Sequence, residues 1–198
     1  MRVRSVLPFM ALAALAACNN GGSVTAENES AQSVAKKVEA ANIKPLPGRW
    51  EAKMKMESLE AEGVPPQVRE AMNKQMGVER AISTCLTPEQ VNKPGGGFFA
   101  GGAEDCTYKH FTMAGGKIDA EMTCGTQPGS PIMTMSGAYS ESSYDIKVRT
   151  KTEMQPGKPM TMAMAVSSRR VGECDGKEDI GEKDIKAMEE WSKKHRAE

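Results

Sequence analysis

The sequence has few aromatic residues and no apolar run long enough to cross a membrane as a helix. Phe, Trp and Tyr together make up 5% of its 198 residues. The apolar run from Val6 to Ala14 is far shorter than the about 20 residues that a membrane-spanning helix needs. Methionine is plentiful instead, with 15 residues. We therefore expect a core of flexible side chains that is only weakly specified by shape.

The sequence motifs of common enzymes are missing as well. There is no GxSxG nucleophile elbow, no HExxH zinc motif, and no arrangement of serine, histidine and acid that the spacing reveals. The glycine-rich stretch 93–105 lacks the GK[ST] ending of a phosphate-binding loop, so it is interpreted as a plain loop. The sequence predicts a non-enzymatic protein without a cofactor or a bound nucleotide.

Charge of one sign is not in excess. The chain has 26 basic and 26 acidic residues, and removal of Arg2 and Arg4 with a leader would leave 24 against 26. A nucleic-acid-binding surface needs an excess of basic residues. We therefore expect no nucleic-acid partner.

The first 17 residues are typical of a secretory signal peptide. Two arginines precede the short apolar run, and small residues then lead to a cysteine. The residues LAAC, which end at Cys18, resemble the bacterial lipobox. This resemblance implies cleavage after residue 17 and acylation of Cys18.

A lipidated Cys18 would hold the protein on a membrane. Stable anchoring takes two lipid signals, and a triacylated cysteine exceeds that requirement. Asn19 follows the cysteine, whereas aspartate at this position is the signal for retention in the inner membrane. The expected location is therefore the periplasmic face of the outer membrane.

The remaining chain divides into three predicted parts. Residues 18–43 are polar with almost no bulky apolar side chains, which predicts a lipidated flexible tether. Residues 44–176 are predicted to form a disulfide-linked antiparallel β domain. Residues 177–198 are predicted to form a charged C-terminal helix, because Ile185, Met188 and Trp191 lie along one side among charged residues.

Period-two alternation of apolar and polar residues predicts the β domain. It is clear in 50–57 and in 144–152, where one face would be buried and the other solvated. Residues 64–76 instead have helical spacing after a proline start, which predicts a short inserted helix over one edge of the core. The predicted fold is mainly β: an antiparallel meander of about seven strands that forms a curved open sheet or a partial barrel.

Four cysteines follow the predicted anchor, an even number in a compartment that oxidises thiols. They are Cys85, Cys106, Cys124 and Cys174. No two have the CxxC spacing of a redox or zinc motif, so structural disulfides are expected. A three-residue loop at 114–116 would pair Met113 with Lys117 and Cys106 with Cys124, which favours that bridge and leaves Cys85 to join Cys174.

The stretch MTMAMAV at 160–166 has methionine at every second residue. If Met154 opposes Met160 and Tyr139 opposes Tyr144 in the neighbouring hairpins, Met133 and Met164 lie on one face with Thr150 between them. Two interstrand spacings would then separate these methionines by about 9.6 Å.

Cu(I) prefers soft thioether ligands, and the candidate ligands for it are Met133, Met162, Met164 and His110. His110 joins them because the predicted hairpin register puts it on the face of Tyr108 and Met122. The alternation is also explained by burial in a core, or by a groove for an apolar ligand, since methionine adapts to irregular surfaces.

Several short motifs resemble one family. They are PGRW at 47–50, GVPP at 63–66, CLTPEQ at 85–90, the Gly137-Ala138-Tyr139 strand and RRVGEC at 169–174. Together with Cys106 and Cys124 they resemble the domain of unknown function 3617 family of proteobacterial exported proteins, over about Leu46 to Cys174. The resemblance implies a secreted or lipid-anchored envelope protein, and it brings no catalytic residues.

The function expected from the sequence is that of a lipid-anchored lipoprotein, a non-enzymatic binding or structural module. Its contact with the membrane would be the N-terminal lipid. Its further partner would be an envelope protein or an apolar ligand. The alternative is a periplasmic copper-binding or methionine-based antioxidant protein.

Overall fold

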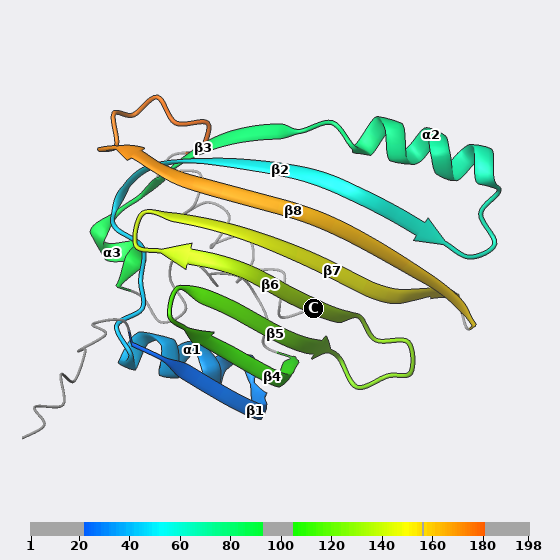
Figure 1. The fold of residues 1–198 in the computed structure, drawn as a ribbon, viewed down its shortest axis with the longest axis horizontal. Coiled ribbons are helices and arrows are strands. Elements are labelled where there is room, and N and C mark those ends of the chain that lie inside the picture. Colours follow the sequence, from blue (N-terminus) through cyan, green and yellow to red (C-terminus); the bar gives the residue numbers. More distant parts are fainter. Residues whose placement is uncertain (1–21, 93–104, 156, 181–198) are drawn as a thin grey trace, which may run out of the picture.

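The computed structural model describes residues 22–92, 105–155 and 157–180. Its centre is one antiparallel sheet of eight strands, in the spatial order β1-β4-β5-β6-β7-β8-β2-β3 (Figure 1). The strands are β1 Val24–Ser30, β2 Gly48–Ala61, β3 Arg80–Leu86, β4 Cys106–Ala114, β5 Lys117–Cys124, β6 Ile132–Ser140, β7 Ser143–Gln155 and β8 Lys158–Gly172. The helices of the described residues are α1 Ala31–Ala40, α2 Pro66–Met76 and α3 Pro88–Val91. The mainly β class and the curved open sheet are confirmed, with eight strands where about seven were expected.

Strands β4 to β8 form the meander that the hairpin pattern predicted, because each is hydrogen-bonded to the next in the chain. The β4–β5 turn consists of Gly115 and Gly116, both with positive φ, a conformation that glycine adopts at little cost. Strand β2 then lies beside β8, so an early strand pairs with the last one. The N-terminal and C-terminal parts of the sheet are thereby joined.

Strand β1 and helix α1 replace most of the predicted tether. Ser30 caps α1 by accepting a hydrogen bond from the Ser33 N–H at 3.2 Å. Val34 and Val38 of α1 are buried, and Figure 1 shows α1 alongside β1 and β4. The tether predicted for 18–43 is therefore wrong from residue 24 on. Cys18 lies outside the described residues.

The hydrophobic core is concentrated under α1. Its buried side chains come from β1, α1, β4 and β5, and the largest are Phe111 and Met113, each 1% exposed. The cluster comprises Val24, Ala26, Val34, Val38, Cys106, Tyr108, Phe111, Met113, Ile118, Ala120 and Met122. One end of the sheet thus has a dry core, with a helix as its second layer.

Helix α2 extends past the end of β2 (Figure 1), and none of its residues is buried. The prediction that this helix covers an edge of the core is therefore wrong. Asn73 makes its main polar contact: the side-chain oxygen accepts from the Leu59 N–H at 2.8 Å, and the amide donates to the Leu59 carbonyl at 3.2 Å. Asn73 thus provides hydrogen-bond partners for backbone groups of β2 where its edge is no longer paired with β3.

The segment after β8 returns to the outer edge of β3. The Ile180 N–H donates to the Ser83 carbonyl at 3.0 Å, and the Cys85 N–H donates to the Ile180 carbonyl at 3.3 Å. Residues 177–180 form no helix, so the helix predicted for 177–198 is wrong at its start. The rest of that prediction lies outside the described residues.

A half-buried methionine face as the candidate functional site

One face of the sheet is apolar across nearly all of its strands, but only part of it is buried. Under α1 this face is the core, whereas on β6, β7, β8 and β2 most of its side chains are half-buried, although Trp50, Leu59 and Ala61 of β2 are buried. We call this second part the methionine face. Its members are Met54, Met56, Met133, Met135, Ile146, Val148, Met160, Met162, Met164 and Val166.

The register of the four strands makes the methionine face continuous. Met164 of β8 lies between Val148 of β7 and Met56 of β2. Met135 of β6 lies on the other side of Val148. Neighbouring strands are about 4.8 Å apart, so side chains at these positions contact one another across the sheet.

The methionine face differs from the core in burial. No side chain of β6 is fully buried, and the same holds for the described side chains of β7. The positions of this face on β6 and on the described part of β7 carry no charge. At one end of this face lie Trp50 and Tyr144, whose stacked rings have centroids 6.2 Å apart.

The opposite face of these strands is polar and ion-paired. Lys147 lies 3.3 Å from Glu57, and Arg169 lies 2.6 Å from Asp145. These side chains are exposed, so the pairs contribute little to stability. A hollow of about 430 Å³ lies among the lysines and small residues of this face, including Lys55. Most side chains of this face on β2, β6 and β7 are exposed, as the alternation predicted.

A second apolar surface lies on α2. Val68, Met72 and Met76 are spaced by four residues on one side of the helix and are 49%, 37% and 42% exposed. This stripe is narrow, since it belongs to one helix. It is the competing site for an apolar ligand.

The predicted β7–β8 register is shifted by two residues. Thr152, rather than Met154, opposes Met160, and an irregularity between Glu153 and Gln155 accommodates the difference. Because side chains alternate with a period of two, the shift keeps every methionine on the predicted face. The predicted pairing of Tyr139 with Tyr144 is confirmed.

The shift changes which methionines face Thr150. Met133 and Met162 now lie on either side of it, in place of Met133 and Met164. These two are still about 9.6 Å apart, two interstrand spacings. Met133 is therefore too distant to share a ligand sphere with the methionines of β8.

His110 does not lie on the methionine side of the sheet. The β4–β5 turn has two residues, so Ala114, not Met113, is the partner of Lys117. Further along this ladder, an irregularity between Tyr108 and His110 adds one residue to β4. The extra residue reverses the side to which His110 points. Its Nε2 lies 2.8 Å from Asp119 Oδ1 on the exposed face. The prediction that His110 shares a face with Tyr108 and Met122 is wrong.

Both predicted disulfides are present. Cys106 and Cys124 are opposed on β4 and β5, with Cα atoms 4.0 Å apart. Cys85 and Cys174, with Cα atoms 5.5 Å apart, tie β3 to the segment after β8. The first bridge thus lies in the half of the sheet with β4 and β5, and the second lies in the other half, with β8, β2 and β3.

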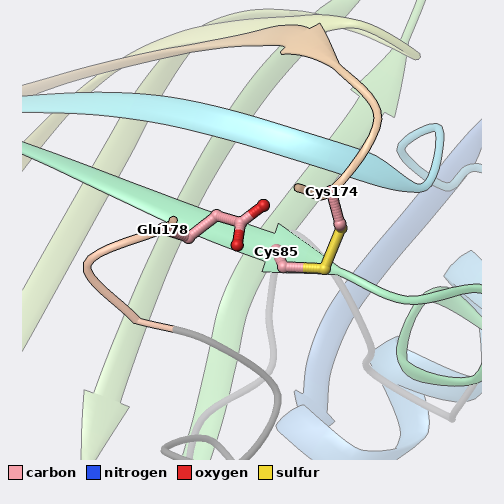
Figure 2. A group of neighbouring side chains, drawn as sticks. All are labelled: Cys85, Cys174 and Glu178. Carbon is pink, nitrogen blue, oxygen red and sulfur yellow. A yellow bond between two sulfur atoms is a disulfide. The ribbon is translucent and has the colours of Figure 1, made fainter. Parts of the chain in front are cut away.

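Figure 2 shows Glu178 beside the Cys85–Cys174 disulfide. The two sulfurs and a carboxylate oxygen lie within 4.8 Å of one another, which is metal-binding spacing. The sulfurs are bonded to each other, however, and a cysteine binds a metal as a thiolate. This group is therefore not the site of a metal while the disulfide is intact.

Two carboxyl groups have lowered pKa values for structural reasons. The N–H and hydroxyl of Ser83 donate to Asp179 at 2.8 and 3.0 Å and lower the pKa of that carboxyl. Hydrogen bonds from Lys37 and Ser33 lower the pKa of Glu29. Burial raises the pKa of Tyr108 within the core. Asp179 thus binds the edge strand β3, Glu29 binds residues of α1, and Tyr108 lies in the core.

The described structure defines a class: a disulfide-linked, open-sheet β protein with a half-buried apolar face. The family described as "Protein of unknown function (DUF3617)" matches residues 45–174, and the chain belongs to this family. The match includes β2 to β8 and both disulfides, whereas β1 and α1 precede it. No curated protein and no solved structure matches the chain. No helix of the described residues has the length and hydropathy to cross a membrane.

The sequence located the methionines of the candidate site but missed how they are grouped. Met162 and Met164 belong to the methionine face as predicted. Met54 and Met56 were predicted to lie on a strand, yet nothing in the local pattern indicated that this strand borders β8. The predicted Cys85–Cys174 bridge was the available signal, because it brings an early strand near the last one.

Proposed function

We propose that this protein is a non-enzymatic lipoprotein, anchored through Cys18 at the periplasmic face of the outer membrane, which binds an acyl chain on the methionine face. The observation that carries the proposal is the half-burial of one continuous apolar surface on four adjacent strands. Contiguous exposed apolar surface is rare on soluble proteins and marks binding sites.

The chemistry of the surface favours an apolar ligand of variable shape. Methionine is unbranched and flexible, so its side chains adjust to different ligands. The described positions on β6 and β7 offer no charge to a polar head group. Burial of apolar surface is worth about 25 cal/mol per Å², so a ligand with a long hydrocarbon segment gains most.

The leader supports the same assignment. A lipid on Cys18 would keep the β domain beside a membrane, where acyl chains are abundant. The two disulfides suit an oxidising compartment outside the cytoplasm. An exported module with an apolar face would therefore lie where acyl chains occur.

Acyl-chain binding is tested with two variants of neighbouring residues on β7. Val148 belongs to the methionine face, and Arg149 is exposed on the opposite face. We would titrate a fluorescent fatty acid into the chain from residue 18 with Cys18→Ser, which keeps every described residue. We expect Val148→Asp to weaken binding at least tenfold and Arg149→Asp to leave it unchanged.

The folded state of each variant is checked by circular dichroism and urea unfolding. Folded Val148→Asp protein with wild-type affinity would contradict the proposed site. Absence of saturable binding to the unsubstituted chain would contradict the proposed function itself.

The anchor is tested separately in a proteobacterial host. The full-length chain is expected to lose residues 1–17 and to gain the mass of three acyl chains, and Cys18→Ser should abolish both changes. Asn19→Asp should move the protein from the outer to the inner membrane. A mature protein without lipid, recovered from the soluble periplasm, would refute the anchor.

A further inference from the structure

Strand pairing brings together three methionines from distant parts of the sequence. Met56 of β2 is directly opposite Met164 of β8, and Met162 follows two residues along β8 on the same face. Cβ atoms of directly opposed residues, here Met56 and Met164, are about 4.5–5.5 Å apart. Met162 and Met164 are about 6.8 Å apart along β8, and the diagonal from Met56 to Met162 crosses an irregularity of the ladder between Met56 and Ser58. Three thioethers therefore start within the reach of one another's side chains.

We propose that Met56, Met162 and Met164 form a binding site for Cu(I). Thioether sulfur is a soft ligand that selects Cu(I) over the harder divalent ions. Each methionine has three rotatable bonds, which allow the sulfurs to converge on one ion. All three side chains are half-buried, so an ion can reach them and they keep room to move.

The surroundings suit a monovalent soft ion. Val148 and Thr150 border the cluster on β7, and buried Leu59 lies opposite Met162 on β2. These neighbours supply neither charge nor a carboxylate. A hard, strongly hydrated divalent cation would lose water there without a compensating anion, whereas Cu(I) forms bonds of substantial covalent character with sulfur.

The register also says which methionines do not belong to the site. Met54 lies opposite Arg80 on β3, and a guanidinium beside it disfavours a cation. Val148 lies between Met135 and Met164, so these two methionines are about 9.6 Å apart, which is two interstrand spacings. The site thus keeps two predicted candidates, Met162 and Met164, and adds Met56.

The site lies on the methionine face but does not depend on the proposed acyl-chain binding, because it requires only three sulfurs in reach of one ion. The two activities can be separated by substitution. Met56→Leu and Met164→Leu remove a sulfur each with little change of volume or apolar area. They should therefore affect Cu(I) far more than a fatty acid.

The test uses the chain from residue 18 with Cys18→Ser, so that no free thiolate competes for copper. Mass spectrometry first verifies that the chain is four hydrogens lighter than its reduced form, as two disulfides require. Cu(I), maintained with ascorbate, is then titrated in competition with bicinchoninate. We expect one Cu(I) per chain, with affinity lowered at least tenfold by Met56→Leu or Met164→Leu.

Met135→Leu is the matched control, since it changes the same side chain on the same face outside the site. It should leave the affinity for Cu(I) unchanged. In parallel, Cu(I) should shift the ¹³C-methyl resonances of Met56, Met162 and Met164 but not that of Met135. Absence of binding, equal loss in all three variants, or methyl shifts elsewhere would each overturn the proposal. Fatty-acid binding by the same variants reports on the proposed function alone.

Discussion

Replacement of Met113 and Met164 by alanine, one at a time, separates the core from the methionine face. Met113 is 1% exposed in the cluster under α1, whereas Met164 is half-buried. A buried Met→Ala change costs about 2–5 kcal/mol, from lost transfer free energy and the cavity left behind. We expect Met113→Ala to lower the free energy of unfolding by an amount in this range.

Met164→Ala should cost much less. Full burial of a methionine side chain is worth roughly 1.5–3 kcal/mol, so half-burial corresponds to about 1 kcal/mol. An open surface also closes around the smaller side chain or admits water, and therefore adds little cavity cost. The expected difference between the two variants is at least about 1 kcal/mol.

Urea unfolding with both disulfides intact measures the two changes. The unfolding slope should be the same in both variants, so the shifts in midpoint report stability directly. If Met164→Ala destabilises the protein as much as Met113→Ala, the methionine face is core. The reasoning that makes it a binding surface would then be refuted.

Three further predictions concern the supports of the sheet. On the chain-entropy model, replacement of Cys85–Cys174 by serines, which opens a loop of 89 residues, should cost about 4.6 kcal/mol. Replacement of Cys106–Cys124, with a loop of 18 residues, should cost about 3.2 kcal/mol, and the reverse order in urea unfolding would contradict this. Gly137→Ala would place a Cβ atom 2.1 Å from the Asp145 carbonyl oxygen, so β6 and β7 must separate and the thermal midpoint should fall; an unchanged midpoint would contradict the close approach. Ser83 lowers the pKa of Asp179 from 3.8, so the stabilisation by this carboxylate is present above pH 3.8 and is lost as the pH falls through the lowered pKa. A pH-independent stability difference between Asp179→Asn and the unsubstituted chain would refute this linkage.

The strands of the meander could be predicted because side-chain alternation is a local signal. The opposition of Tyr139 and Tyr144 followed from a short turn. Cys106 and Cys124 are opposed as predicted although their turn has two residues rather than three, because the irregularity between Tyr108 and His110 compensates for the difference. The pairing of β2 with β8 could not be predicted in this way. It joins residues 99 to 123 positions apart, and a half-buried strand does not specify its neighbour.

Two errors have a common physical cause, which is a short or irregular strand. Strand β1 buries only Val24 and Ala26, so its sequence resembled a polar tether. The irregularity beside His110 adds one residue to β4, and no residue type marks such a position reliably. The error at His110 changed the candidate site, because His110 had been a candidate ligand, whereas β1 belongs to the core end of the sheet.

The most direct test of acyl-chain binding on the methionine face is cross-linking with a photoactivatable fatty acid. The chain from residue 18 with Cys18→Ser would be irradiated with the probe and the modified peptides mapped by mass spectrometry. Binding to the methionine face predicts modification on β6, β7, β8 and β2, including 160–166, with competition by unlabelled fatty acid. Modification confined to α2, at Val68, Met72 or Met76, would contradict it.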